Sequence, residues 1–102
     1  MTPALQARVF EAHPELAFHE LNGGTPVVPN KRNAEGRARR WALLEAAGIP
    51  RPDRPRAGEA EDDLVDACAE LWIAGRLARG EAVRVPPVPV RDARGLRMEI
   101  WH

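Results

Sequence analysis

A short run near the N-terminus combines acidic groups and an imidazole at a spacing that could do chemistry. Glu11 and His13 stand two residues apart at the end of an apolar stretch, and Glu15 follows Pro14. Because side chains alternate along a strand, Glu11 and His13 would share one face. Glu11 could then ligate a metal ion or exchange a proton, with His13 and Glu15 in support. The alternative interpretation is a solvated strand face without chemistry.

A second group of acids opens the longest helical pattern of the sequence. Asp63, Asp66 and Glu70 recur at the spacing of one helical stripe. Asp66 lies among apolar positions, and a buried ionised carboxylate needs a cation, a metal ion or several donors. Asp63 and Asp66 are therefore candidates for metal ligands. The acids that precede Asp63 are equally consistent with stabilisation of the helix N-terminus by its dipole.

Basic residues cluster around the start of the preceding helical pattern: Lys31, Arg32, Arg37, Arg39 and Arg40. Three of them, Lys31, Arg37 and Arg40, are possible phosphate contacts, because positive charge and free N–H groups at a helix N-terminus hold anions. Two alternatives stay open. The basic residues could form a solvated helix face, or they could pair with the acidic block 59–63.

Periodicity and chain breakers predict an α/β fold in which about three helices pack on a short, incomplete sheet. The predicted helices cover 15–21, 34–47 and 60–79, and the predicted strands lie near 7–12 and 96–101. A loop is predicted over 49–58, and a Pro-rich, polyproline-like connector over 81–92. Two short strands do not make an independently stable sheet, so the pattern is typical of part of a larger domain.

Composition limits the function classes. A chain of 102 residues is expected to form one domain, and fifteen Lys+Arg balance fifteen Asp+Glu, which argues against wholesale electrostatic capture of nucleic acid. The single cysteine, Cys68, excludes an intrachain disulfide and suits a reducing cytoplasm. No apolar run approaches the roughly 20 residues that span a bilayer. We therefore expect a cytoplasmic protein without a membrane partner.

Several short pieces of the chain occur in a distinctive order: the run from Val9 through Glu15 to Phe18, Leu21-Asn22-Gly23-Gly24, Lys31 followed by Glu35-Gly36-Arg37 and Arg40, Asp62-Asp63-Leu64-Val65-Asp66-Ala67, and Met98-Glu99-Ile100-Trp101. This series resembles the C-terminal half of the domain-of-unknown-function family numbered 429, a family of predicted nucleases with an RNase-H-like fold. The resemblance covers nearly the whole chain.

The resemblance implies a metal-dependent phosphodiester hydrolase. In such enzymes two divalent ions, Mg²⁺ or Mn²⁺, clamp the attacking and leaving oxygens. By resemblance, Glu11 would be a strand carboxylate of the metal site and Asp66 the helix carboxylate, with Asp63 as second choice. Lys31 and the arginines that follow it would lie near the site as phosphate contacts, and nucleic acid would be the partner.

One departure from the family pattern changes the expectation. The family's first strand carries an Asp, whereas no acidic residue precedes Glu11 in this sequence. We therefore expect a C-terminal half-domain that works with a missing N-terminal half, a partner chain or a second copy. The alternative function is a non-catalytic interaction module that docks on a partner or self-associates, by strand addition or by helix packing.

Overall fold

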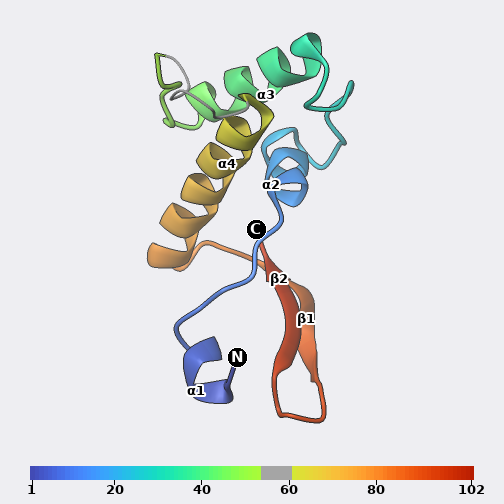
Figure 1. Cartoon of the computed structure of the whole chain (residues 1–102), viewed down its shortest axis with the longest axis vertical. Coiled ribbons are helices and arrows are strands. Elements are labelled where there is room, and N and C mark those ends of the chain that lie inside the picture. The colour runs from blue at the N-terminus through green and yellow to red at the C-terminus, as the bar shows by residue number, and fades with distance from the viewer. Residues whose placement is uncertain (54–60) are drawn as a thin grey trace.

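The computed structural model of the chain describes residues 1–53 and 61–102, so the part of the predicted loop 49–58 beyond residue 53 lies outside the described residues. The elements follow the order α1 (Pro3–Gln6), α2 (Pro14–Leu21), α3 (Ala34–Ala46), α4 (Glu61–Ala78), β1 (Arg84–Arg91) and β2 (Arg97–Trp101). Helices α2, α3 and α4 gather at one end of the molecule, whereas α1 and the β1–β2 hairpin lie at the other (Figure 1). The predicted α/β class is confirmed.

Local capping signals set the starts of two helices. Pro14 is the first residue of α2, and the Nδ1 atom of His13 accepts a hydrogen bond of 3.2 Å from the backbone N–H of Glu15. Asn33 caps α3 in the same way, because its side-chain oxygen accepts a bond of 2.9 Å from the N–H of Glu35. The three predicted helices are confirmed, with ends that differ by at most one residue; the predicted start of the third, at residue 60, lies outside the described residues.

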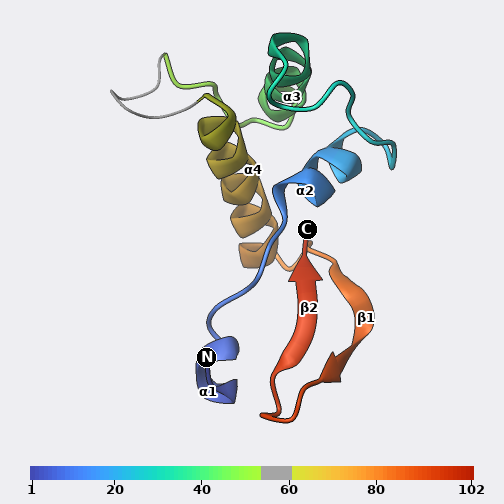
Figure 2. The same cartoon turned by 45° about the vertical axis from the view of Figure 1, so that its right-hand side comes forward.

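The apolar core lies between the three longer helices. Helix α4 packs against both α2 and α3, and α2 crosses α4 (Figure 2). The buried apolar residues are Ala17, Phe18, Val27, Trp41, Leu44, Val65, Cys68, Ala69 and Ile73.

Burial raises the pKa of the Cys68 thiol, which keeps it protonated and unreactive at neutral pH. No described helix has the length and apolar character that crossing a membrane requires.

The sheet is a two-stranded antiparallel hairpin. Arg84 lies opposite Trp101 and Arg91 opposite Arg97, with a register shift between Val85 and Val90. The predicted strand near 96–101 is thus confirmed. The prediction of a polyproline-like connector over 81–92 is wrong, since most of that segment forms β1. Its prolines lack N–H donors but are tolerated because β1 pairs on one side only.

The predicted strand near 7–12 is wrong except at its end, where Ala12 forms an isolated parallel bridge with Trp101. The Gln6 side chain makes hydrogen bonds to β2 where backbone pairing between the predicted strand and β2 was expected. The amide of Gln6 accepts from the N–H of Arg97 and donates to its C=O, both at 2.7 Å. The carbonyl of Glu11 then accepts from the N–H of Trp101 at 2.8 Å. The N-terminal segment is therefore held beside β2 at two points rather than along its length.

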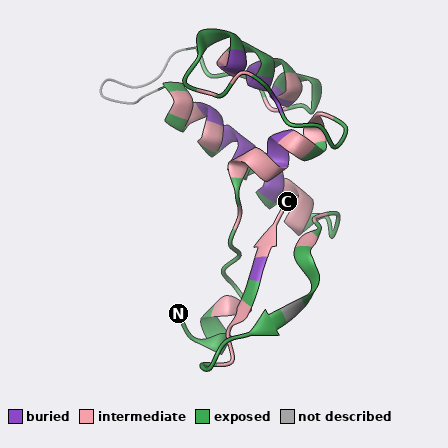
Figure 3. Ribbon diagram, turned by 90° about the vertical axis from the view of Figure 1, so that its right-hand side faces the viewer, coloured by how far each residue is buried: buried purple, intermediate pink, exposed green. Residues whose placement is uncertain are grey.

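Burial divides the molecule into two unlike parts. The buried apolar residues all lie between Ala17 and Ile73, in the helical part. The hairpin is mostly exposed or half-buried, and its buried residue is the charged Glu99 on β2 (Figure 3). Among the described large apolar residues, all that are exposed except Val28 and Leu71 lie within residues 1–10 and 83–98. The hairpin part thus exposes apolar surface instead of burying it.

Candidate functional site

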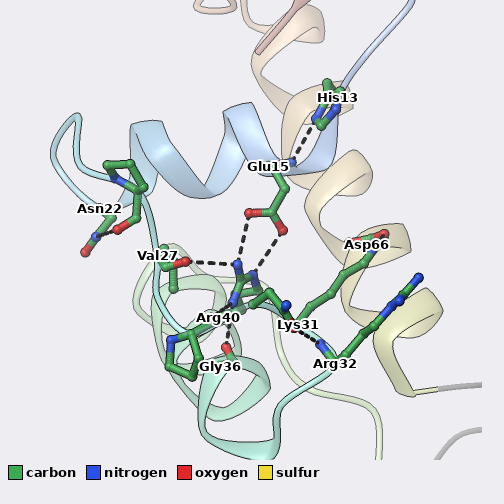
Figure 4. A network of polar contacts seen from close by, with 12 residues as sticks. His13, Glu15, Asn22, Val27, Lys31, Arg32, Gly36, Arg40 and Asp66 are labelled. Carbon is green, nitrogen blue, oxygen red and sulfur yellow. Dashed lines mark hydrogen bonds and ion pairs between the residues drawn. The ribbon is translucent and has the colours of Figure 1, made fainter.

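The polar centre of the helical part is Arg40, on α3. Its guanidinium forms a bidentate ion pair with Glu15 on α2, with Nε to Oε1 at 3.1 Å and Nη2 to Oε2 at 3.0 Å (Figure 4). The side chain of Arg40 is only 2% exposed, and the guanidinium lies over the ring of Phe18, 5.5 Å from its centroid. Glu15 was expected to support a catalytic group; the structure gives it the role of joining α2 to α3.

The remaining donors of Arg40 bind backbone carbonyls. Nη1 donates to Pro29 and Gly36 at 2.8 and 3.0 Å, and Nη2 donates to Val27 at 3.1 Å. With the two bonds to Glu15, all five N–H donors of the guanidinium are occupied. Arg40 therefore has no donor left for a phosphate group, and its predicted role as a phosphate contact is replaced by a structural one.

The close approach of α3 to the loop before it depends on Gly36. A Cβ atom at this position would lie 2.1 Å from the carbonyl oxygen of Asn30 and 2.4 Å from that of Pro29. Glycine lets these carbonyls approach the helix and reach Arg40. The loop over residues 27–31 is thereby fixed against α3, which places Lys31 beside α4.

Lys31 forms an ion pair with Asp66 of α4 (Figure 4). The hydrogen bond to Asp66 raises the pKa of Lys31, and this effect outweighs the partial burial that acts in the opposite direction. The need of Asp66 for a cation, expected from its place among apolar residues, is met by this lysine. Its other oxygen, Oδ1, is buried and has no hydrogen-bond partner among residues 1–53 and 61–102.

Arg37 also binds within the fold. Its Nη1 donates to the carbonyls of Lys31 and Arg32, and its Nε lies 3.2 Å from a carboxylate oxygen of Glu61. Together with Lys31 and Asp66, this pair joins the basic residues around α3 to the acids at the start of α4. Pairing with the acidic block 59–63 is the alternative that the charge pattern left open, and among the described residues it occurs at one point, between Arg37 and Glu61. Arg39 and Arg40 pair with Glu35 and Glu15 instead, and residues 59 and 60 of the block lie outside the described residues.

The predicted metal ligands are not assembled into a common site. Asp66 pairs with Lys31, Asp63 is exposed on α4, and Glu11 contacts β2 through its backbone carbonyl. His13 caps α2 instead of supporting Glu11. Within residues 1–53 and 61–102, no three His, Cys, Asp or Glu side chains are grouped so that they could hold a metal ion.

A second polar cluster, which sequence reasoning missed, lies on the hairpin. Glu99 is 6% exposed and binds the Nε of Arg97 at 2.7 Å, while the Nη1 of Arg84 lies 3.7 Å from its Oε2. Burial opposes ionisation of Glu99, but the side chains of Arg97 and Trp101 as hydrogen-bond donors, together with the charges of Arg97 and Arg84, prevail and lower its pKa. The available signal was an acid inside an otherwise apolar run, Met98 to Trp101.

An open cleft of about 790 Å³ adjoins this cluster. Its walls come from the N-terminal segment, with Val9, Phe10 and Glu11, and from β2, with Met98 and Glu99. The ring of Phe10 packs edge-on against Trp101, with centroids 5.6 Å apart. In this cleft the exposed apolar residues Val9, Phe10 and Met98 adjoin the buried, charged Glu99.

Comparison with known proteins identifies a family but no individual related protein or structure. No curated protein and no solved structure matches the chain. A family model described as "Protein of unknown function (DUF429)" matches residues 1–91 of the 102, which include the Arg40 network and β1 but not β2. The chain belongs to the DUF429 family.

Proposed function

We propose that this chain is an interaction module that docks onto another protein through the exposed apolar surface of residues 1–10 and 83–98. The observation that supports this proposal is the burial pattern of this surface. Its charged residue Glu99 is buried, whereas four of its apolar residues are exposed: Phe10, Val88, Val90 and Met98. Contiguous exposed apolar surface on a small domain is typical of an interaction site. A two-stranded hairpin is also marginal by itself and gains stability from a partner that covers it.

The proposal is tested by sedimentation of the fluorescently labelled chain in extract of its source organism. Val88 is 81% exposed and Val90 59%, so Val88→Ser with Val90→Thr removes apolar surface without disturbing the core. Leu71→Ser on α4, also 59% exposed, is the matched control. We expect the wild type and the Leu71 variant to sediment as a saturable complex and the hairpin variant as a monomer. Identical sedimentation of all three chains contradicts the proposal.

A metal-dependent nuclease is the second candidate, and it rests on the family resemblance and on the unpartnered Oδ1 of Asp66. The residues present do not fit a metal centre by themselves. The described part of the chain contains no group of three potential metal ligands, and Asp66 already forms an ion pair with Lys31. A Mg²⁺ or Mn²⁺ site that cuts nucleic acid would need ligands beyond Glu11, Asp63 and Asp66. Binding of these ions and of nucleic acid stays a prediction.

Thermal melts with and without Mn²⁺ test this second candidate. Metal binding to the native state raises the melting temperature by mass action. A rise in the wild type that is lost in Asp66→Asn and kept in Glu70→Gln supports a site at Asp66. An unchanged melting temperature in the wild type removes the nuclease candidate.

A further inference from the structure

The middle of β1 identifies the kind of partner more closely, and this inference rests on the proposed docking function. The register of the hairpin shifts between Val85 and Val90, and residues 86–89 of β1 have no partner on β2 in this register. Three of these four residues are prolines, which lack the N–H donor that a ladder uses. The stretch is therefore held to β2 at both ends but is not paired along its length.

The sequence of this stretch, Pro86-Pro87-Val88-Pro89, is a P-x-x-P pattern. A polyproline II helix has three residues per turn, so the first and last residues of the pattern fall on the same edge of such a helix. Proline holds φ at about −65°, which is close to the value in that helix, and a segment restricted in this way loses little entropy on binding. Aromatic-lined grooves of binding domains recognise segments of this kind. Together with the two residues that follow, the pattern forms what we call the P-x-x-P segment, residues 86–91.

The P-x-x-P segment is accessible on the surface of the hairpin. Pro86, Pro87 and Val88 are exposed, and Val88, at 81%, is among the most exposed apolar residues of the described part. Val90 and Arg91 at the end of the segment are exposed as well. A partner can therefore reach the segment while the hairpin stays folded.

Arg91 adds a positive charge to the end of the segment. Its guanidinium donates to the carbonyl of Gly95 at 2.8 Å and forms no ion pair with another described residue. The carboxylate of the neighbouring Asp92 is bound within the turn, where its Oδ1 accepts from the N–H groups of Arg94 and Leu96. We infer that the partner is a protein with an aromatic-lined groove for the P-x-x-P segment and a carboxylate beside that groove for Arg91.

A second copy of this chain does not supply an aromatic-lined groove. The chain has two Phe, three Trp and no Tyr. Phe18 and Trp41 are buried in the core, and Trp72 is covered by a guanidinium of its own helix, 4.8 Å from the ring centroid. Phe10 and Trp101 pack edge-on against each other. The occupant is therefore a different protein.

Competition by synthetic peptides in the sedimentation experiment tests this inference. The probe is the acetylated and amidated peptide of residues 84–91, Arg-Val-Pro-Pro-Val-Pro-Val-Arg. One control peptide carries Ala at all three proline positions, and the other carries Glu in place of the last Arg. Because a polyproline II ligand needs no tertiary fold, we expect the probe to dissociate the complex of the labelled chain in extract. Half-dissociation should need about tenfold less of the probe than of either control.

Each other outcome overturns the inference in a distinguishable way. A complex that depends on Val88 and Val90 but resists the probe means that the folded surface docks by another mode, and the docking function itself stands. Equal competition by the Ala peptide overturns recognition of the prolines, and equal competition by the Glu peptide overturns the carboxylate beside the groove. A complex that forms in buffer without extract and is dissociated by the probe identifies a second copy as the occupant. Absence of any complex removes the docking function together with this inference.

Discussion

Arg40 and Glu15 form a bidentate ion pair that joins α3 to α2 (Figure 4). The pair is asymmetric in burial, because Arg40 is 2% exposed whereas the Glu15 side chain is 42% exposed. Three backbone carbonyls complete the bonding of the guanidinium, so the pair fixes the loop between the helices as well as the helices themselves. Arg40, the least exposed charged residue of the described part, therefore links α2, α3 and the loop between them.

Replacing Arg40 is therefore expected to lower the free energy of unfolding. Arg40→Ala removes the side-chain donors to Glu15 and to the carbonyls of Val27 and Pro29 and should cost about 3 kcal/mol. Arg40→Lys keeps the charge but loses the planar fork, so most of that loss should remain. Urea unfolding measures both. The matched control is Arg39→Lys, whose exposed pair with Glu35 should contribute less than about 0.5 kcal/mol. Equal effects at the two positions would contradict this role of Arg40.

Two helical glycines should respond in opposite directions to alanine. Gly36→Ala forces a Cβ against the carbonyls of Asn30 and Pro29 and should destabilise the chain by about 2 kcal/mol, as overpacking does. At Gly75 the nearest atom is the flexible end of Arg79, at 3.1 Å, so alanine there should stabilise α4 by up to about 1 kcal/mol. Thermal unfolding of both variants measures the signs. Stabilisation by both substitutions would show that the loop does not approach α3 as described.

Acid should open the hairpin before it unfolds the helices. The pKa of Glu99 is lowered in the folded chain, so its contribution to stability is present above the ordinary glutamate pKa of about 4.3 and is lost as the pH falls through the folded value. Hydrogen exchange of the β2 amides between pH 6 and pH 3 measures this loss. In Glu99→Gln the protection factors of the β2 amides, which are taken relative to the intrinsic exchange rate at each pH, should no longer fall as the pH is lowered. An unchanged profile in that variant would exclude Glu99 as its cause.

Lys31 and Asp66 should lose their coupling at high pH. The pKa of Lys31 is raised, so its stabilising effect is complete below the ordinary lysine pKa of about 10.4 and declines as the pH rises through the folded value. A double-mutant cycle with Lys31→Met and Asp66→Asn should give about 1 kcal/mol of coupling at pH 7 and less at pH 11.5. A coupling of zero at pH 7 would leave Asp66 available to other cations.

The helical part of the fold could be predicted because its signals are local. Asn33 as a cap and Pro14 at a first helical position mark where α3 and α2 begin, and apolar periodicity marks their buried faces. The hairpin could not be predicted in the same way. Its prolines are unfavourable for a central strand, and they are accommodated because β1 pairs on one side and because they lie in the irregular stretch between Val85 and Val90.

The charged residues of the candidate site could be predicted from the sequence, but which of them form ion pairs with each other could not. The need of Asp66 for a cation followed from its apolar neighbours, yet the choice of Lys31 depends on a loop held by Gly36 and Arg40. The roles of Gln6 and Glu99 depend on contacts between the two ends of the chain, since Gln6 and Arg97 are 91 positions apart in the sequence. Periodicity within one segment carries no information about such contacts.

The central claim is that the hairpin and the N-terminal segment form a docking surface for another protein. Photo-crosslinking in cells of the source organism tests it most directly, with benzoyl-phenylalanine placed at Val88, at Met98 or, as the control, at Leu71. The account predicts one dominant adduct with the same foreign protein at Val88 and Met98 and none with that protein at Leu71. Adducts of equal yield at all three positions, or none at Val88 and Met98, would contradict it.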